Sequence, residues 1–593
     1  MAALFTTPRR NDTTAGTHVA EPDVRRRIGL AHGSRRRVTR RIVSGAVCAL
    51  TVSSLLMPSV SLAAEWVKVG GNKYNTAASD EAGTWSWDGA DDLKLNNYNG
   101  GEIQAAGKLN VNYSGTNIVT AEWIESIKVS HGTNENAELN IQGDEGGTLS
   151  VTSTEDAILS TGNINIDGAG SVNATSTGFD AINAGGDLAI KGSGNVNATG
   201  ASDGIRANGN ITIDDSGAVT ARATKDKGIG ADKNLTIKGG GTVEASSADG
   251  EALWSGGNIN ISDGSQVKAS SEKDAAVEAK GSLAVTNASL DASGVEYGVY
   301  AYKGVTLDHA TVMVRTSANG GQAIALITDG DDIVIKNGST VDAFAEGEVS
   351  AAFSTRNDRP NEKGGHIYIS DSVVKAIARY VENGDGPIPY SENQDGETRR
   401  EPQGENIGII AQTSEGVTPA VISIIRSKVT AEGDTAAIFA RAMSADGKTI
   451  GTIKIENAAI QTPEGGKVID YRKLRDGIYE AGQAIGTGHA TVDSLYIKAV
   501  AKSTTIAPPE VAKPEDPKPD ETKPAESKPA ESKQNPKPEG SKPTKAVAAS
   551  TTKAKTTGVL AATGDTSGAA IVATVLAGTA AIAAGTMASR KRS

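Results

Sequence analysis

The sequence predicts an all-β protein whose main domain is a right-handed parallel β-helix with about 24 residues per coil. A motif Asn-φ-x-φ, in which φ is aliphatic, recurs every 23 or 24 residues. Two further short strand patterns recur in each period, and turns rich in Gly separate them. Aromatic residues make up only 4% of the 593 residues while Gly numbers 69, which suits a narrow core of small aliphatic side chains. Right-handed winding is the default for parallel strands.

The first strand of each coil is the Asn-φ-x-φ motif. Its alternation of apolar and polar residues is typical of a strand. One coil cannot bury its own apolar face, but stacked coils can. We therefore expect a single β-helix across about 90–500, whose interior contains a file of isoleucines spaced 24, 23, 24 and 24 residues apart: Ile166, Ile190, Ile213, Ile237 and Ile261. A β-sandwich array, the alternative fold, would not give this period.

The second and third strands follow from two weaker patterns. A valine, usually followed by x-Ala, stands six residues after the first strand, at Val172, Val196, Val219, Val243 and Val267. The third strand is a small residue and an aliphatic one, at Ala157-Ile158, Ala181-Ile182, Gly204-Ile205, Gly228-Ile229, Ala252-Leu253 and Ala276-Val277. Gly, Asn and Asp at the joints suit the left-handed turn conformation.

Three columns of polar residues accompany the strands. Before the first strand stand Asn163, Asp187, Asn210, Asn234 and Asn258, which we expect to form a hydrogen-bonded ladder between coils. After the first strand stand Asp167, Lys191, Asp214, Lys238 and Ser262, whose alternating signs predict ion pairs between neighbouring coils. Before the third strand stand Asp156, Asp180 and Asp203, followed in the same column by Lys227 and Glu251. The three aspartates predict a calcium site, unless water and turn amides satisfy them.

The regular coils are preceded by a segment rich in tryptophan and interrupted by two insertions. Residues 64–137 hold Trp66, Trp85, Trp87 and Trp123, which predict a cap and the first coils ahead of the regular β-helix at 138–505, with a sugar-binding role for Trp85 and Trp87 as the alternative. Insertions at 356–365 and 382–404 break the period. The second contains Tyr390, Arg399 and Arg400, which are candidate ligand-binding residues because loops on a rigid scaffold often carry function.

Residues 1–63 have the composition of a secretory signal. Their first part is polar and rich in arginine, an apolar segment follows from Ile42 to Leu62, and small residues stand at its end. We expect cleavage between Ala63 and Ala64. The general secretory route is favoured over twin-arginine export because no Phe-Leu follows the paired arginines. The only cysteine, Cys48, lies in this signal, so no disulfide stabilises the exported chain.

The exported part is strongly acidic. The whole chain has a formal net charge of −12, and residues 64–564 alone carry −21, because 1–63 contribute +7 and 565–593 contribute +2. An acidic exported chain is a poor candidate for binding nucleic acid. It suits a solvated surface protein or one that gathers cations.

The C-terminal part contains a spacer and a tripartite tail. Residues 506–557 are rich in Pro, Lys and Glu and hold too few apolar residues for a core, so we expect an extended, disordered spacer. The tail at 560–593 starts with the pentapeptide Leu560-Ala561-Ala562-Thr563-Gly564. An apolar run at about 569–588 is long enough to cross a bilayer as a helix, and the basic triplet at 590–592 follows it.

This tail resembles the cell-wall sorting signal of Gram-positive surface proteins. The pentapeptide is similar to the Leu-Pro-x-Thr-Gly sortase motif, with Ala561 in place of proline, as in the Leu-Ala-x-Thr-Gly variant of a sortase class of high-GC Gram-positive bacteria. The resemblance implies cleavage by sortase after Thr563 and covalent attachment of Thr563 to peptidoglycan. The mature protein would then lie at the cell wall and contact the membrane only before sorting. A plain membrane anchor is the alternative.

The coils over about 139–345 are similar to those of bacterial carbohydrate-binding β-helix proteins and solenoid adhesins, through their Gly-Asn-Ile-x-Ile, Asp-Gly-Ile and Gly-x-Val-x-Ala patterns. This likeness implies binding or adhesion to a polysaccharide or a host surface glycan, with calcium as the one cofactor indicated. β-Helices also host polysaccharide lyases and hydrolases. Here, however, His366 has no acidic pair in motif form, so we expect no enzyme.

Overall fold

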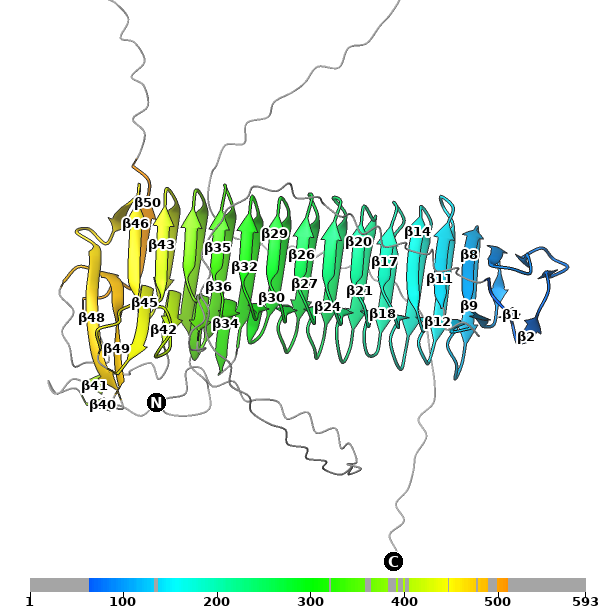
Figure 1. The fold of residues 1–593 in the computed structure, drawn as a ribbon, viewed down its shortest axis with the longest axis horizontal. Coiled ribbons are helices and arrows are strands. Elements are labelled where there is room, and N and C mark those ends of the chain that lie inside the picture. The colour runs from blue at the N-terminus through cyan, green and yellow to red at the C-terminus, as the bar shows by residue number, and fades with distance from the viewer. Residues whose placement is uncertain are drawn as a thin grey trace, which may run out of the picture. The chain divides into compact units, whose positions relative to one another are not determined.

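The computed structural model describes residues 63–509, apart from 133–136, 319–320, 358–363, 382–390, 393–397, 400–404, 446, 476–477 and 489–498. Every element in this part of the chain is a strand. The strands form three long, predominantly parallel sheets, named A, B and C below, and each coil contributes one strand to each sheet. The predicted parallel β-helix is therefore confirmed, and its coils stack in chain order along one axis (Figure 1).

Sheet A holds the first strand of each coil, as the Asn-φ-x-φ motif predicted. Along the rod it contains β3 (Ala78–Ser79), β4 (Trp85–Trp87), β5 (Asp92–Asn96), β8 (Lys108–Ser114), β11 (Glu138–Gly143), β14 (Asn163–Gly168), β17 (Leu188–Lys191), β20 (Ile211–Asp214), β23 (Leu235–Lys238), β26 (Ile259–Ser262), β29 (Leu283–Thr286), β32 (Val305–Asp308), β35 (Ile333–Lys336), β38 (Ile367–Ser370), β43 (Val421–Ile425) and β46 (Thr452–Glu456).

Sheet C holds the second strand of each coil. It contains β6 (Asn99–Gly100), β9 (Thr116–Ala121), β12 (Thr148–Ser153), β15 (Ser171–Ser176), β18 (Val196–Gly200), β21 (Ala218–Ala223), β24 (Thr242–Ser247), β27 (Gln266–Ser271), β30 (Ser289–Gly294), β33 (Thr311–Ser317), β36 (Thr340–Gly347), β39 (Val373–Tyr380), β44 (Lys428–Gly433), β50 (Ser503–Ala507) and β47 (Ala459–Thr462).

Sheet B holds the third strand of each coil. It contains β1 (Trp66–Val69), β2 (Asn72–Tyr74), β7 (Ile103–Ala106), β10 (Ile127–Ser130), β13 (Ile158–Ser160), β16 (Ile182–Ala184), β19 (Ile205–Ala207), β22 (Ile229–Ala231), β25 (Leu253–Ser255), β28 (Val277–Ala279), β31 (Tyr297–Ala301), β34 (Gln322–Asp329), β37 (Val349–Asn357), β42 (Asn406–Thr413), β45 (Ala436–Ser444), β49 (Ile478–Gly486) and β48 (Lys467–Arg475). A separate two-stranded sheet pairs β40 (Ser391–Glu392) with β41 (Thr398–Arg399).

The predicted register is observed in the regular coils. In sheet A the isoleucines of the predicted file pair one above the other, and each is at most 4% exposed: Ile166, Ile190, Ile213, Ile237 and Ile261. The predicted valines pair in the same way in sheet C, from Val172 to Val267. All these side chains belong to one apolar core that runs through the rod. Copies of one position thus stack on one another and exclude water from the interior.

The turn after each strand of sheet A uses the left-handed conformation repeatedly. Gly168 and Gly192 have φ of 99° and 80° there. In other coils the same turn holds non-glycine residues with positive φ: Asp215, Asp263, Asn287, His309, Asn337, Asp371, Arg426 and Asn457. Most of these are Asp or Asn, which tolerate this conformation better than other side chains do. The joint composition seen in the sequence therefore reflects a backbone requirement that recurs coil after coil.

The asparagine column forms the expected ladder, although most of its hydrogen bonds run from backbone to side chain. Oδ1 of Asn163 accepts the backbone N–H of Asp187 at 2.9 Å, and the Asp187 carboxylate accepts the N–H of Asn210 at 2.7 Å. Each side chain thus satisfies an amide at the turn of the next coil. Stacking between two amide side chains is cleanest in another column, where Asn165 donates to Asn140 and Asn140 to Asn110, both at 2.8 Å.

The charged column after the first strand contains one of its expected ion pairs. Lys238 Nζ lies 2.9 Å from a carboxylate oxygen of Asp214 on the preceding coil. Solvent reaches this pair and screens it, so its contribution to stability is small.

The N-terminal end is closed by antiparallel strands. β1 pairs with β2 and β7, and β4 pairs with β3 and β5, all antiparallel, before parallel winding begins with β5, β6 and β7. Trp85 and Trp87 are buried in the core, as a cap requires, whereas Trp123 is 80% exposed and covers nothing. The cap therefore ends near Leu93, and the first coils occupy the remainder of 64–137.

The C-terminal end departs from the expected β-helix at 138–505. Parallel pairing ends at β46. Beyond it, β50 pairs antiparallel with β44 and β47, and β49 pairs antiparallel with β45 and β48. Residues 459–507 therefore include a second cap. A coil without a following neighbour would leave strand edges and apolar side chains open, and antiparallel strands cover them.

Candidate functional site

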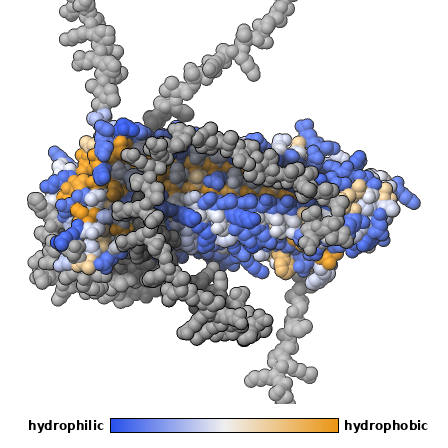
Figure 2. Space-filling view, viewed as in Figure 1, coloured by the Kyte–Doolittle hydropathy of each residue, from blue (hydrophilic) through white to orange (hydrophobic). Residues whose placement is uncertain are grey.

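The outward face of sheet B differs from the rest of the rod. From β13 to β28 each strand of this sheet has only three residues, so one side chain per coil points outward. From β31 on, the strands lengthen to five, eight or nine residues, and nearly every residue is buried on either face. Figure 2 shows a largely hydrophilic visible surface with an apolar band and apolar side chains at the C-terminal end of the rod.

A group of aromatic side chains lies where the strands of sheet B begin to lengthen. Trp254 of β25 pairs with Glu278 of β28, and Glu278 pairs with Tyr300 of β31, so these three occupy one outward column on successive coils. The Tyr300 and Tyr302 rings stack with centroids 4.5 Å apart, and Tyr297 lies 5.0 Å from Tyr300. Tyr297 and Tyr300 are buried, whereas Trp254 and Tyr302 are half-buried and expose part of their rings. We call Trp254 and Tyr302 the aromatic platform.

Two lysines hold the charges around this platform. Lys280 Nζ contacts the Glu278 carboxylate, donates to the Tyr302 hydroxyl at 3.0 Å and lies 4.3 Å from the Tyr302 ring centroid. Lys227 Nζ contacts Asp226 and lies 5.3 Å from the Trp254 ring centroid. Both ammonium groups are therefore already paired with a carboxylate and with an aromatic ring.

Glu251 is the carboxyl group with the most unusual environment. Burial and the adjacent Glu278 carboxylate raise the pKa of Glu251 to about 7, and Lys227 opposes this rise only in part. Among the described residues no cation forms an ion pair with Glu251. Glu278 itself contacts Lys280, so Glu251 is the member of the two that binds a proton more readily.

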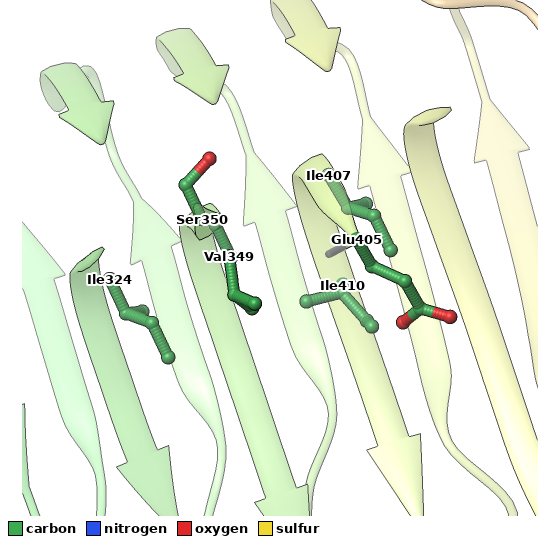
Figure 3. A pocket seen from close by; sticks show the side chains of 7 residues that line it. Ile324, Val349, Ser350, Glu405, Ile407 and Ile410 are labelled. Carbon is green, nitrogen blue, oxygen red and sulfur yellow. The ribbon is translucent and has the colours of Figure 1, made fainter. Parts of the chain in front are cut away.

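Farther toward the C-terminal end, the outward face of sheet B carries an apolar strip. A small hollow in it is lined by Ile324, Val349, Ser350, Ala351, Glu405, Ile407 and Ile410 (Figure 3). Ile324, Ala351 and Ile407 pair in one row across β34, β37 and β42. These side chains belong to a second apolar cluster, separate from the core of the rod, that also includes Phe439 and Tyr471.

A ladder of charged side chains borders this strip. Arg356 Nε lies 3.2 Å from Asp329. Arg441 is buried, with its guanidinium 2.8 Å from Glu405, 3.4 Å from Glu480 and 2.6 Å from the Gln412 amide oxygen. Glu405 immediately precedes β42, whereas Glu480 belongs to the antiparallel cap. Arg441 therefore ties the start of β42 to the C-terminal cap, and we assign this ladder a structural role.

The aspartates predicted to bind calcium do form one column. Their oxygens, however, accept hydrogen bonds from backbone amides. Oδ1 of Asp156 accepts the backbone N–H of Asp180 at 3.0 Å, Asp180 accepts that of Asp203 at 2.9 Å, and Asp203 accepts that of Lys227 at 2.6 Å. Asn183 Nδ2 donates to the second oxygens of Asp156 and Asp180. Within the described part of the chain no group of three or more acidic or histidine side chains could hold a metal ion. The calcium prediction therefore has no ligand set here.

Burial gives these aspartates an unusual affinity for protons. It raises the pKa of Asp156 and Asp180, although backbone amides and Asn183 or Arg206 act in the opposite direction. It raises the pKa of Asp203 to about 6, against the hydrogen bond from the Lys227 amide. Because unfolded Asp loses its proton near pH 4, the folded chain binds more protons than the unfolded chain between about pH 4 and 6. The free energy of unfolding therefore falls as pH rises through this range.

We expect Asp203→Asn to remove part of this pH dependence. The amide keeps an oxygen for the Lys227 N–H but has no charge to bury. Above pH 6 the variant should be more stable than the parent by up to about 3 kcal/mol, and the difference should vanish near pH 4. Thermal melting from pH 4 to 8 measures it. Asp187→Asn, in the exposed asparagine ladder, serves as the matched control, and an equal pH effect there would contradict the prediction.

The side chains of His366 and Asp332 bond to the backbone. Oδ1 of Asp332 accepts the His366 N–H at 2.9 Å, and Nδ1 of His366 lies 3.1 Å from the backbone nitrogen of Val421. Nδ1 must accept that hydrogen bond, so it is not available as a base in this arrangement.

The remaining predicted site residues lie at or beyond the limits of the described chain. Tyr390, Arg400 and the sortase motif, Leu560 to Gly564, lie outside the described residues, as does the apolar run at 569–588. Arg399 belongs to β41. At the predicted signal cleavage site, the backbone of Ala63 pairs with Lys108, and the side chain of Ala64 is buried. In the part of the chain that the structure describes, no helix is long and apolar enough to span a bilayer.

The aromatic platform was not singled out from the sequence, although a signal existed, and Glu251 was noted only as a member of the column before the third strand. In the third strand, the residue after the aliphatic one points outward, and this position reads Leu159, Asn183, Arg206, Gly230, Trp254, Glu278 and Tyr300 along the coils. A tryptophan and a tyrosine in a column that points away from the core mark a candidate binding surface.

Comparisons with known proteins add no relative. No family model matches the chain, and neither a curated protein nor a solved structure matches it.

Proposed function

We propose that this chain is a non-enzymatic surface protein of a Gram-positive bacterium, exported, joined to peptidoglycan by sortase, and used to bind a glycan with its β-helical rod. The anchoring part rests on the tail that begins at Leu560 and on the N-terminal signal. The binding part rests on one observation, the aromatic platform with charged groups beside it on the outward face of sheet B.

The chemistry of the platform suits a sugar. The hydrophobic face of a pyranose packs against an aromatic ring, and its hydroxyl groups need charged or polar partners at the ring edges. Trp254 and Tyr302 supply half-exposed rings. Glu251, Glu278 and Lys280 supply donors and acceptors next to them. The long rod holds this surface rigidly, and the proline-rich spacer at 506–557 would carry it away from the cell wall.

Truncation of the platform tests the proposal. Trp254→Ala and Tyr302→Ala should each weaken the binding of the purified full chain to its glycan by at least about tenfold, because buried aromatic anchors dominate such interfaces. A glycan array followed by titration calorimetry measures this. Tyr368→Ala, on sheet A and 37% exposed, is the matched control. Wild-type affinity in both platform variants, or no glycan bound by the parent chain, would contradict the proposal.

A wall-anchored polysaccharide lyase or hydrolase is the second candidate, and the pKa of Glu251 near 7 is the observation that favours it. Glycoside hydrolysis, however, uses a second carboxyl group that can reach the substrate, whereas Glu278 is buried and already contacts Lys280. The binding protein is therefore the better supported function. Release of new reducing ends or unsaturated products from a bound polysaccharide, lost in Glu251→Gln, would instead establish the enzyme.

A further inference from the structure

We propose that Trp123 and Phe179 extend the aromatic platform along the rod, so that the ligand is a linear, neutral polysaccharide lying parallel to the rod axis. This inference rests on the proposed glycan-binding function and specifies the class of glycan. It starts from the exposure of these two side chains and from their position in the turns between sheets C and B.

Trp123 and Phe179 are the two most exposed large apolar side chains in the described part of the chain, at 80% and 51%. Trp123 follows β9 and Phe179 follows β15, so both lie in a turn that leads from sheet C to sheet B. The backbone of Trp123 has a φ of 67°, which bulky residues rarely adopt, and its N–H donates to Thr154 Oγ1 at 2.9 Å. A strained backbone that holds a large ring in water points to function and not to packing.

The turns between sheets C and B connect Phe179 with the platform. The Ser202 N–H donates to the Phe179 carbonyl at 3.0 Å, and the Asp226 N–H donates to the Ser202 carbonyl at 3.3 Å, so these residues stack on successive coils. In the last of these turns Lys227 contacts Asp226 and lies 5.3 Å from the Trp254 ring centroid. Phe179 and the platform therefore border the same row of turns.

This row is long enough for several sugar units. Trp123 lies two strand spacings before Phe179, because β9, β12 and β15 pair in succession. Trp254 lies three spacings beyond Phe179, because β16, β19, β22 and β25 do the same. At ~4.8 Å per spacing, Trp123 and Trp254 are roughly 24 Å apart along the rod axis. The coils stack along that axis (Figure 1), so a ligand that contacts both residues must be a chain of several sugars lying parallel to it.

The spacing of the rings suits a polymer of small units better than a protein partner. Protein interfaces use contiguous apolar patches. Here half-exposed polar residues, Thr154 and Ser202, occupy the turns beside Trp123 and Phe179. Isolated rings match the apolar faces of successive sugars, and hydroxyl groups between the rings match the sugar hydroxyls.

The charges along the row disfavour an acidic polysaccharide. Glu122 precedes Trp123, and Glu155 lies in the turn of the next coil. Among the described residues no cation forms an ion pair with either carboxylate. Lys227, farther along the row, is already paired with Asp226. A uronic acid would therefore be repelled near Trp123 and would compete with a protein carboxylate for Lys227, so a neutral glycan fits better.

Affinity electrophoresis tests the charge of the ligand. The full chain is run through gels that contain xylan, mannan, a soluble β-glucan or polygalacturonate. We expect at least one of the three neutral polymers to retard the chain and polygalacturonate to leave its mobility unchanged. Retardation by polygalacturonate stronger than that by every neutral polymer, or retardation by none of the neutral polymers, would overturn the inference.

Titration calorimetry with two oligomers of the retarding polymer tests the row itself. A trimer is shorter than the distance from Trp123 to Trp254, and a decamer is longer. The parent chain should bind the decamer at least about tenfold more tightly, because the decamer reaches both ends of the row. Trp123→Ala and Phe179→Ala should each remove most of this preference and leave the trimer affinity within about twofold, since the platform is intact. Trp123→Phe keeps a ring and should keep most of the preference.

Tyr368→Ala, which removes an exposed ring from sheet A, is the matched control and should behave as the parent chain does. Equal affinity of the parent chain for both oligomers would overturn the inference. So would an unchanged preference in both alanine variants of the row, or an equal loss in the control. Trp123 and Phe179 lie on different coils, so either variant decides the case if the other fails to fold.

Failure of the inference differs from failure of the proposed function. A chain that binds trimer and decamer equally, and loses both through Trp254→Ala, keeps its function at the platform and loses the inference. A chain that binds no glycan of any class loses both.

Discussion

Ile213→Asp should remove the cooperative folding of the central coils. Ile213 is 1% exposed and lies between Ile190 and Ile237 in the file that runs through sheet A. A carboxyl group at this position has no partner inside a core of aliphatic side chains. The carboxyl group would take up a proton there, but burying the neutral group without a hydrogen-bond partner still destabilises the fold by about 4 kcal/mol or more. Each coil also supports its neighbours, so the loss spreads to the coils on either side.

Thr212→Asp is the matched control one residue away. Thr212 points outward from the same strand and is half-exposed, so a carboxylate there stays in water. We expect a change within about 0.5 kcal/mol. Hydrogen exchange and limited proteolysis are the better measurements, because a rod of repeats can lose a few coils without unfolding as a whole. Equal protection of both variants, or equal loss, would mean that the assigned register is wrong.

The strands and turns of the regular coils were predictable because a single local condition determines which residue type each position accepts. Ile213 must face the core, Thr212 must face water, and the turn after them must accept a positive φ. These requirements repeat every 23 or 24 residues, so the repetition itself reveals them. The paired file from Ile166 to Ile261 shows that this pattern was sufficient to place both the strands and their register.

The two ends were less predictable because capping does not repeat. At the C-terminal end, β48 and β49 lie antiparallel, although Ile453 and Ile455 still continue the aliphatic pattern of sheet A up to β46. Nothing in the local pattern says that the next strand must turn back. What decides it is the absence of a following coil, which is a property of the whole rod and not of any one segment.

The aspartate column shows why alignment alone does not predict a metal site. The spacing of Asp156, Asp180 and Asp203 correctly placed them one above the other, yet it left out the backbone amide that each coil presents to the coil before it. Each Oδ1 is taken by that amide. The asparagine ladder uses the same hydrogen bond on the exposed side of the rod, at Asn163 and Asp187. Side-chain oxygens at these turns thus serve the backbone first.

The candidate site needed the structure because its members come from different coils. Trp254, Glu278 and Tyr300 are more than 20 residues apart in succession and share no motif. Stacking brings them into one column. Glu251 gains its unusual pKa only through burial and through Glu278. The repeat had indicated which positions face outward, but only the lateral packing of lysines and rings around them distinguishes a binding surface from a merely solvated face.

Thr563→Ala should abolish attachment to the cell wall. In the proposed reaction, sortase cleaves the peptide bond between Thr563 and Gly564 and transfers the Thr563 acyl group to an amine of peptidoglycan, with the C-terminal segment as the leaving group. In this proposal the apolar run at 569–588 would hold the chain in the membrane until that step. With alanine at position 563 the motif is lost while the membrane segment stays. The chain should then move from the wall fraction to the membrane fraction.

Thr557→Ala is the matched control, because Thr557-Gly558 is the other Thr-Gly pair near the tail and lacks the preceding Leu-Ala. Cell fractions treated with a muralytic enzyme show the result, since sorted chains are released with peptidoglycan fragments attached. The control should behave as the parent chain does. A Thr563→Ala chain that still carries such fragments would exclude this residue as the point of attachment.

Truncation after Gly564 separates the two roles of the tail, because a chain without its membrane segment should escape into the medium before sortase can act on it.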